Sequence, residues 1–435
     1  MNIFCNCNEA AIPSGTLAAN RQRHQKQLEG RPTMNNVPLP QHHLLKRWMS
    51  WARRAMEHRV VQAKHAQGAG PLPVRMLLLS DGLSSQSEAQ FDPILRYRSE
   101  LGQKLGLIIE TAHLDVDHPP SARQLAPHGL VLFKLYYKTN PEAVLRLASH
   151  LRNTMSSRSA LIYCDGNDEM TIQWADLCRY CDIYWKKHAF RDRSCYLDRY
   201  RGGTNLTDYA LGEEAGEPQS QTPIAGIQLR KIVCGYSIGL DRKIATLAPL
   251  LRNSANLPAW QDRKYDVMLR ADIPDNWMGK LRRPAAETLH SLQSQLKILL
   301  PQGRVPQKQY AQEMMSSKIC VSPFGYGEIC WRDFEAVTYG CLLIKPSMDH
   351  VESRPDIFQP FKTYVPVTWD FSDLREKLLH YAGQPEECAK MVLRARCVLA
   401  EALETQWFVG VFGELLQAVD TQRSESMIST QSHPA

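Results

Sequence analysis

The sequence predicts an α/β protein with two Rossmann-like layers, and three observations carry that prediction. Between residues 73 and 225, short apolar runs alternate with helical patterns, which is typical of a parallel sheet covered by helices. The same alternation resumes after residue 226. A strand–glycine loop–helix–strand unit over residues 317–349 is the feature around which we expect the second layer to be organised. An N-terminal extension, two α/β domains and a tail are therefore expected at 1–72, 73–225, 226–422 and 423–435.

The basic charge of the chain lies in its first part. The 435 residues carry a formal net charge of +7, and residues 1–70 hold ten Lys and Arg against three Asp and Glu. The remainder holds 42 of each kind and is neutral. A nucleic-acid-binding domain needs a basic footprint on a folded face. The neutral body therefore argues against nucleic acid as a partner.

The first 72 residues predict a flexible basic extension that contains one amphipathic helix. Residues 1–40 are rich in Asn, Gln, Pro and Ala, and we expect them to be disordered. Over residues 44–67 the apolar positions fall mostly on one side, with Arg and Lys elsewhere. Such a helix lies on an anionic membrane surface or packs on the protein's own body, and both alternatives stay open.

The sequence predicts a cytoplasmic protein. It contains no apolar run of about 18 residues, the length that a membrane helix needs. Its start lacks the charged and apolar regions of a secretory signal. Its 12 cysteines are scattered, which favours reduced, buried thiols over a disulfide framework. If residues 44–67 bind lipid, we expect peripheral contact with the inner face of the membrane.

Polar residues follow several of the strands expected in the first layer. These strands are Val74–Leu79, Leu105–Glu110, Leu130–Leu135, Ala160–Cys164 and Cys181–Trp185. Ligands of open parallel sheets bind beyond the carboxyl ends of the strands. The candidate acid, base or acceptor-binding residues at those ends are Asp81, Asp165, Asp168, Glu169 and His188. The alternative is a set of turns and helix N-caps, where Asp and Asn are common.

The second layer begins with a strand expected over Tyr265–Leu269. Arg270 follows that strand and is either a phosphate contact or a surface residue. Residues 200–226, before this layer, are polar and rich in Gly, Pro and Glu, which predicts a long connection. The helices expected here are 286–300, 307–316, 371–381 and 385–409.

The 317–349 unit combines a flexible loop with a charged helix. Strands are expected over 318–321 and 341–344, and a helix from Glu328 to Gly340. On that helix Glu328, Arg332 and Glu335 recur at i, i+4 and i+7. A guanidinium between two carboxylates suits a ligand that carries phosphate and sugar hydroxyls. The alternative is a solvated face with one ion pair.

In this setting the unit resembles the donor-binding segment of the exostosin-like and related group 1 bacterial glycosyltransferases. The resemblance rests on Tyr310, Met314, Ser317, Lys318, Cys320, Pro323, Gly325, the run Arg332-Asp333-Phe334-Glu335-Ala336, Gly340 and Cys341. It is good over residues 305–350 and looser over 225–420. It implies a GT-B fold, in which two Rossmann-like domains face a cleft.

The resemblance also implies roles for individual residues. Arg332 would neutralise the diphosphate of a nucleotide-sugar donor, and Glu335 would accept hydrogen bonds from its ribose. Main-chain N–H groups of Gly325, Tyr326 and Gly327 would reach the phosphates. A nucleotide sugar would be the co-substrate, and neither a metal nor another cofactor is expected. Retaining members often carry two Glu residues eight positions apart.

In this chain Glu328 and Glu335 are seven positions apart, which favours an inverting reaction. Inverting transfer needs a general base, normally from the N-terminal domain. Asp165, Asp168 and His188 are our candidates for that base. Asp349-His350, after the second strand of the unit, is expected either to face the donor sugar or to lie in a surface turn.

Two functions from different classes follow from these expectations. The first is a glycosyltransferase that moves a sugar to a glycan or lipid-linked acceptor in the synthesis of cell-surface polysaccharide or glycoconjugate. The second is a non-catalytic binding or scaffold protein of the same fold, tethered through its basic N-terminal helix.

Overall fold

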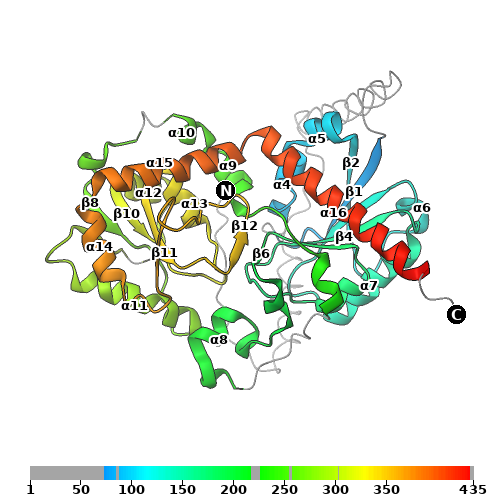
Figure 1. Ribbon diagram of the computed structural model, residues 1–435, viewed down its shortest axis with the longest axis horizontal. Coiled ribbons are helices and arrows are strands. Elements are labelled where there is room, and N and C mark those ends of the chain that lie inside the picture. The colour runs from blue at the N-terminus through cyan, green and yellow to red at the C-terminus, as the bar shows by residue number, and fades with distance from the viewer. Residues whose placement is uncertain (1–72, 85–87, 217–225, 254–256, 302, 432–435) are drawn as a thin grey trace, which may run out of the picture. The chain divides into compact units, whose positions relative to one another are not determined.

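The computed structural model describes residues 73–84, 88–216, 226–253, 257–301 and 303–431 (Figure 1). The predicted extension over 1–72, with its helix over 44–67, lies outside the described residues. The described part contains two parallel sheets joined and flanked by helices, so the predicted α/β class is confirmed. None of the helices in these ranges has the length and apolar character that crossing a membrane requires.

In the described part of the chain, the first sheet has six parallel strands in the order β2-β1-β3-β4-β5-β7. These strands are β1 Val74–Ser80, β2 Leu107–His113, β3 Leu130–Lys134, β4 Ala160–Asp165, β5 Ile183–Lys186 and β7 Ile232–Cys234. Every residue of β3 and β4 is buried, as expected for inner strands of a sheet covered on both faces. The five strands predicted for this half are present within a few residues of their expected bounds.

Strand β7 extends the first sheet beyond the expected domain boundary. It follows residue 226, where the second domain was expected to begin, yet it pairs in parallel with β5. The apolar run Ile232–Cys234 forms the edge strand of the first sheet next to β5, and the register places Val233 beside Trp185. The first sheet therefore takes its last strand from the segment that we had assigned to the second domain.

Helices of the first half begin at recognisable caps. They are α4 Asp92–Arg96, α5 Arg98–Leu105, α6 Ala122–Leu125, α7 Pro141–Thr154 and α8 Asn205–Leu211. Helix α7 starts where the Asn140 side chain accepts hydrogen bonds from two main-chain N–H groups and Pro141 takes the first position. Helix α8 lies in the stretch 200–226, where only a connection was predicted. A capping box between Thr204 and Thr207 starts this helix, so that prediction was wrong for this part.

Within the described ranges, the second sheet has five parallel strands in the order β13-β11-β10-β8-β9. They are β8 Tyr265–Met268, β9 Ile298–Leu299, β10 Ser317–Val321, β11 Leu342–Pro346 and β13 Val365–Val367. The helices after β7 are α9 Arg242–Ala245, α10 Ala248–Arg252, α11 Trp277–Ser291, α12 Gln307–Met315, α13 Trp331–Thr338, α14 Leu374–Ala382, α15 Pro385–Ala402 and α16 Thr405–Gln431. Short 3₁₀ turns lie at Ala175–Arg179, Arg193–Leu197, Arg201–Gly203, Gly212–Ala215, Gly226–Lys231, Ile238–Leu240 and Trp260–Asp262.

The prediction of a helix over 286–300 is wrong at both ends. Helix α11 begins at Trp277 because the Asn276 side chain accepts hydrogen bonds from two N–H groups of the first turn. It ends at Ser291, and Leu299 belongs to strand β9. Leu289, Leu292 and Leu296 belong to one hydrophobic core, whereas Leu299 of the strand packs against the other, so the leucine spacing past Ser291 does not mark a helix.

The last helix returns to the first sheet. Helix α16, red in Figure 1, runs from the second half of the chain towards the first, and its Phe408 ring lies 5.2 Å from the ring of Tyr97. Phe412 packs edge-on against Trp185 of β5 at 5.7 Å. One long helix had been predicted over 385–409 and a polar tail over 423–435. Helix α15 instead ends at Ala402, and helix α16 continues from Thr405 to Gln431 because its apolar face packs against the first sheet.

A two-stranded antiparallel sheet connects the two halves. Strand β6 (His188–Phe190) follows β5 of the first sheet, and strand β12 (Val351–Ser353) follows β11 of the second. Their register pairs Val351 with Phe190 and Ser353 with His188. This pairing brings the carboxyl end of β5 beside the loop that follows β11.

Candidate functional site

The glycine loop lies at the carboxyl end of β10, directly before helix α13. That helix starts at Trp331, three residues later than predicted, because the Asp333 carboxylate accepts a hydrogen bond of 2.9 Å from the Cys330 N–H. Glu328 therefore lies in the loop and not on the helix. The predicted helical face of Glu328, Arg332 and Glu335 does not form.

Arg332 braces two loops at the carboxyl ends of the second sheet. Its guanidinium donates to the Ser322 hydroxyl at 3.0 Å, to the Arg270 carbonyl at 2.7 Å and to the Pro323 carbonyl at 2.9 Å. These partners follow β8 and β10, so the side chain ties two strand ends together. A guanidinium has five N–H donors, and three of them are used in these contacts.

Arg282 is a second cation at the same loop, and sequence reasoning missed it. It reaches from α11 and donates to the Phe324 carbonyl at 2.8 Å and to the Asp272 carbonyl at 2.6 Å. Burial and, second, the positive charge of Arg332 lower the pKa of Arg282 to about 10. Within the described residues, neither Arg282 nor Arg332 has a carboxylate within ion-pair distance. Both side chains are half-buried, and their hydrogen-bond partners are carbonyl and hydroxyl groups, so this loop favours an anion.

The main-chain N–H of Gly325, which was predicted to reach a phosphate, is already used within the loop. The Gly325 N–H donates to the Gly327 carbonyl at 3.0 Å, which closes a tight turn. A Cβ on Gly325 would lie 3.4 Å from Arg282 Nη2, so glycine leaves room beside the guanidinium. Tyr326, between the two glycines, is exposed, and its ring packs edge-on against Trp277 at 6.1 Å.

A buried ion pair supports the loop from below. Lys345 of β11 and Asp333 of α13 are both fully buried, with their charged atoms 3.2 Å apart. The Asp333 carboxylate also accepts a hydrogen bond of 2.5 Å from the Ser322 hydroxyl, the group that receives Arg332 Nε. This chain of contacts fixes the orientation of the Arg332 guanidinium.

Glu335 and Arg270, both predicted to bind the donor, already have charged partners. Glu335 is 2% exposed and pairs with Lys243 at 2.9 Å. Its role as the ribose acceptor stays a prediction. Arg270 forms two parallel hydrogen bonds of 2.8 Å to the Glu313 carboxylate. That bidentate pair neutralises its charge, so Arg282 is better placed as the second phosphate contact.

Glu328 lies in a buried polar cluster that both halves of the chain form. Its Oε1 accepts from Asn205 Nδ2 at 2.6 Å and lies 3.3 Å from His350 Nε2. Glu328 Oε2, Asn205 Oδ1 and His188 Nδ1 are buried and have no hydrogen-bond partner among the described residues. Unpaired buried polar atoms are costly. Glu328 and Asn205 are hydrogen-bonded to each other, so their two unpaired oxygens mark a place where ligand hydroxyls would restore the missing bonds.

Gly327 brings the loop against the first half of the chain. A Cβ on this residue would lie 1.7 Å from the Asp168 carbonyl oxygen, so only glycine allows the contact. The same carbonyl accepts a hydrogen bond of 3.0 Å from His188 Nε2. The histidine is therefore protonated on Nε2, and its unpaired Nδ1 is an acceptor. Burial and, second, the charge of Lys187 hold the pKa of His188 well below 6.5, so the imidazole is neutral at pH 7.

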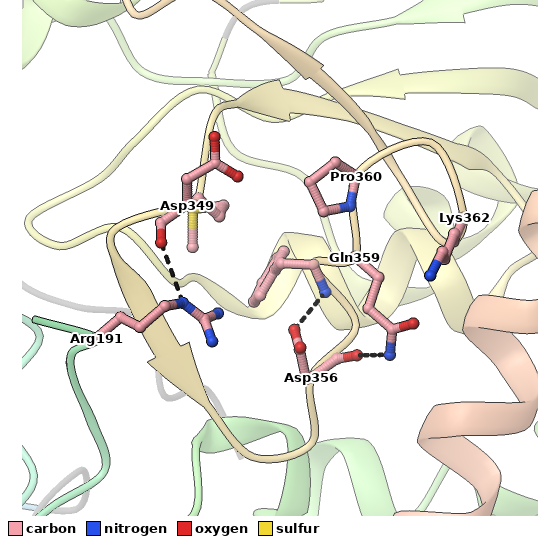
Figure 2. Close-up of a pocket in the computed structure, with 8 residues that line it drawn as sticks. Arg191, Asp349, Asp356, Gln359, Pro360 and Lys362 are labelled. Carbon is pink, nitrogen blue, oxygen red and sulfur yellow. Dashed lines mark hydrogen bonds between the residues drawn. The ribbon is translucent and has the colours of Figure 1, made fainter.

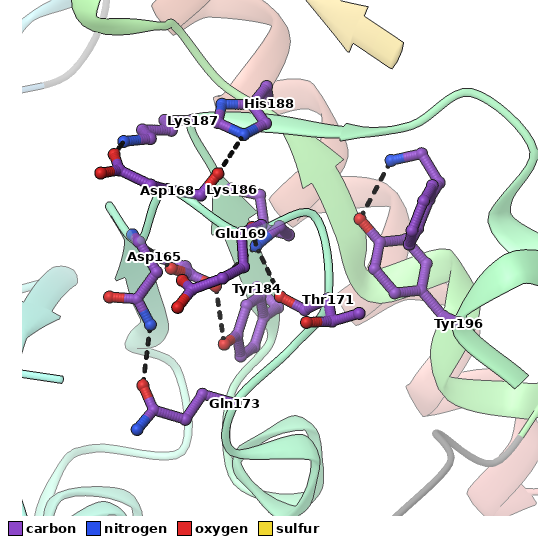
Figure 3. Close-up of polar contacts among 12 residues, drawn as sticks. Asp165, Asp168, Glu169, Thr171, Gln173, Tyr184, Lys186, Lys187, His188 and Tyr196 are labelled. Carbon is purple, nitrogen blue, oxygen red and sulfur yellow. Dashed lines mark hydrogen bonds and ion pairs between the residues drawn. The ribbon is translucent and has the colours of Figure 1, made fainter. Parts of the chain in front are cut away.

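The carboxylates predicted as bases lie in ion pairs (Figure 3). Asp165 is fully buried and binds Lys186 at 2.9 Å and the Tyr184 hydroxyl at 3.0 Å. Burial raises its pKa, but the charge and hydrogen bond of Lys186 outweigh this, so the pKa is lowered overall. Asp168 pairs with Lys187 at 2.5 Å. Of the three predicted bases, His188 is the one that lies outside an ion pair in the described residues, while Asp168 is paired through Oδ1 and its side chain is 42% exposed.

Two further strand-end residues of the first sheet are also accounted for. Asp81 accepts hydrogen bonds from the N–H groups of Leu83 at 3.1 Å and Tyr136 at 2.5 Å, which fits the alternative of a turn-forming residue. Burial raises the pKa of Glu169.

Across the described ranges, no group of three or more His, Cys, Asp or Glu side chains could hold a metal ion.

No family model and no curated protein matches the chain. Solved structures do resemble it. An alpha-glucosyltransferase in complex with UDP has a TM-score of 0.45 and 8% identity, and the match covers 80% of this chain and 100% of that one. A glycosyltransferase from Rickettsia africae ESF-5 has a TM-score of 0.45 and 12% identity, with 80% and 98% covered. An alpha,alpha-trehalose 6-phosphate synthase from Burkholderia multivorans has a TM-score of 0.43 and 10% identity, with 82% and 100% covered. At these values the likeness does not establish a function, which rests on the residues described above.

Proposed function

We propose that this protein is a glycosyltransferase that moves a sugar from a nucleotide-sugar donor to a hydroxyl group of a glycan or lipid-linked acceptor. The observation that carries the proposal is the pair of half-buried guanidinium groups, Arg282 and Arg332, at the glycine loop. They have no carboxylate partner among the described residues, and the loop leads directly to the polar cluster around Glu328. An anion site beside unpaired hydroxyl-binding atoms suits a nucleoside diphosphate sugar.

The two arginines would stabilise the departing diphosphate. As the bond between the anomeric carbon and the phosphate oxygen breaks, its electron pair stays on that oxygen. Fixed cationic donors stabilise this developing charge without reorganisation. Glu328 and Asn205 would accept hydrogen bonds from the sugar hydroxyls through their unpaired oxygens. Cationic side chains then take the role that a metal ion has in other transferases, and the reaction would need no bound metal.

His188 would act as the general base. The acceptor hydroxyl would bond to the anomeric carbon as its proton moves to Nδ1, the neutral and unpaired nitrogen of the ring. One displacement of this kind inverts the anomeric centre. The seven-residue separation of Glu328 and Glu335 supports the same stereochemistry. The protein would work in the cytoplasm on cell-surface glycan synthesis, with residues 44–67 as a peripheral membrane contact.

The proposal is tested with the purified full chain and a panel of UDP-, GDP- and dTDP-sugars. Release of the nucleoside diphosphate is followed with and without acceptors, and with a metal chelator present. We expect one donor to be turned over and the rate to survive chelation. If calorimetry detects no binding of UDP, GDP or dTDP, the proposal is wrong.

One observation favours the non-catalytic alternative. Asp165, Asp168 and Glu335 already lie in ion pairs, so the buried base His188 is the remaining candidate for proton transfer. A binding protein of this fold would bind a nucleoside diphosphate and release no product from any donor. Binding without turnover in the same panel would assign this second function.

A further inference from the structure

A cavity opens beside the loop that follows β11. It has a volume of about 400 Å³ and lies between the segment after β6 and the segment that follows β11 (Figure 2). Its polar walls are formed by Arg191, Asp349, Asp356, Gln359 and Lys362. A cavity of this size is within the range of small-ligand sites.

The charges around this cavity cancel. Arg191 and Lys362 are cations, and Asp349 and Asp356 are carboxylates. The carboxylates disfavour a phosphate, and the cations disfavour a metal ion. A hydroxyl group can donate to a carboxylate and accept from an ammonium or guanidinium group. The interleaved walls therefore suit a neutral ligand with many hydroxyls.

Three of the five polar wall residues, Arg191, Asp349 and Lys362, are exposed, so a ligand would replace water at their free donors and acceptors. Arg191 uses Nε and Nη2 on the carbonyls of Asp349 and Val351, at 3.1 and 2.8 Å. Its Nη1 and the Nζ of Lys362 make no hydrogen bond or ion pair within the described part of the chain. Asp356 uses one oxygen to accept from the Phe358 N–H at 3.1 Å, as Figure 2 shows. Burial, opposed in part by Arg191, raises the pKa of this carboxyl group, so it is already partly removed from water.

The remaining walls of the cavity are apolar. Met348 and Phe358 are almost fully buried beneath it, and Pro360 closes one side. A sugar ring has an apolar face of C–H groups and a rim of hydroxyls. Apolar surface with a few convergent polar groups is the general pattern of small-ligand sites.

The cavity adjoins the polar cluster of the candidate site through one residue. His350 follows Asp349 of the cavity wall, and its Nε2 lies 3.3 Å from Glu328 Oε1. The His350 carbonyl in turn accepts from the Arg191 N–H at 2.8 Å. Two saccharides bound on either side of His350 would therefore be close neighbours.

From this arrangement we infer that the cavity is a saccharide subsite that holds the acceptor glycan of the proposed transferase. That the ligand is the acceptor rests on the proposed function. That it is a saccharide rests on the cavity alone. Both halves of the chain contribute walls, since Arg191 follows β6 and the other residues follow β11. An acceptor held here would be fixed relative to both halves.

The test measures saccharide binding and nucleotide binding separately in the full chain. Maltose, cellobiose, lactose and N,N′-diacetylchitobiose are titrated with saturation-transfer NMR, in the presence of UDP. Lys362→Ala and Asp356→Asn remove one donor and one acceptor from the walls. Lys390→Ala, an exposed lysine of α15, is the matched control.

We expect at least one disaccharide to bind the wild-type chain and Lys390→Ala equally, and to bind each wall variant about tenfold more weakly. UDP affinity stays unchanged in all four proteins. The inference is overturned if the wall variants bind the disaccharide as the wild type does. It is also overturned if none of the four disaccharides binds to wild-type protein that binds UDP. Binding of inorganic phosphate that is lost in Lys362→Ala would also overturn the inference and would assign an anion site. Loss of UDP binding in the wild type contradicts the proposed function instead.

Discussion

The carboxyl ends of both sheets carry charged residues, but the protein compensates these charges differently at the two ends. At the first sheet, Asp165 and Lys186 neutralise each other in full burial, and further hydrogen bonds complete the coordination of both groups. At the second sheet, Arg282 and Arg332 are held by carbonyl groups and a hydroxyl. A strand-end position therefore does not define a role. The role depends on whether the protein itself supplies the counter-charge.

The same distinction separates residues within the second sheet. Arg270 follows β8 and was a predicted phosphate contact, but Glu313 satisfies it in bidentate geometry. Arg282, on the next helix, has no such partner among the described residues. The difference in compensation between these two arginines appears only in the folded chain.

The largest expected effect is on stability at the first sheet. Asp165→Asn leaves the Lys186 ammonium buried without a counter-charge, which we expect to cost about 3–5 kcal/mol of unfolding free energy. Asp176→Asn removes an exposed i,i+3 pair with Arg179 and should cost less than about 1 kcal/mol. Urea denaturation measures both. Equal losses would show that Asp165 is not the compensated structural charge described here.

Next is the effect of Arg332 on turnover. Arg332→Met removes a half-buried cation from the proposed diphosphate site, and we expect the rate of nucleotide release to fall about 10²–10³-fold. Because the side chain also braces two loops, the melting temperature should fall. Rates are therefore measured well below the transition, with Arg394→Met of α15 as the exposed control. A folded Arg332→Met variant with wild-type rates would remove this residue from the site.

A smaller effect is expected at the polar cluster. Glu328→Gln keeps the shape of the side chain but replaces a charged acceptor by a neutral one. We expect kcat/KM for the donor to fall about 10–100-fold, because hydrogen bonds to charged groups contribute about 1.5–3 kcal/mol. Glu386→Gln, exposed on α15, should change nothing. Steady-state kinetics with the donor from the panel decides between these outcomes.

The smallest effect is the pH dependence of stability that His188 contributes. The unfolded chain protonates this histidine below about pH 6.5, whereas the folded chain holds its pKa far lower. The unfolded state then binds more protons, so stability falls as pH drops below 6.5, by up to about 1.4 kcal/mol per pH unit. His188→Gln should flatten this slope between pH 6.5 and 5, and His290→Gln on α11 should not. Identical slopes in the wild type and His188→Gln would show that the folded imidazole titrates normally.

Local patterns predicted most of the fold. The strands β1, β3, β4, β8, β10 and β11 and the helix α12 follow the predicted ranges closely. The errors arose where tertiary contacts decide the outcome. Helix α16 is long because Trp185 and Tyr97 receive its apolar face, and β7 joins the first sheet because β5 has a free edge for it. Trp185 and Tyr97 lie far from α16 in the sequence, and β5 lies far from β7.

The candidate site was predictable in position but not in composition. Gly325, Gly327, Glu328 and Arg332 lie together at the carboxyl end of β10, as their spacing suggested. Arg282 was missed although it stands in the basic run Lys280–Arg283, because the predicted helix began after it. Lys243 and Asn205 contact Glu335 and Glu328 from segments far away in the chain, and no local pattern marks them.

The most direct test of the central claim is a calorimetric titration of UDP into the wild-type chain and two neighbouring variants. Arg282→Met removes a cation that has only carbonyl partners in the described structure, and Arg283→Met removes an exposed cation from the next position of the same helix. We expect Arg283→Met to bind UDP as the wild type does, and Arg282→Met to bind it at least about tenfold more weakly. Equal affinity in all three proteins would contradict the claim that the uncompensated arginines of the second sheet form the diphosphate site.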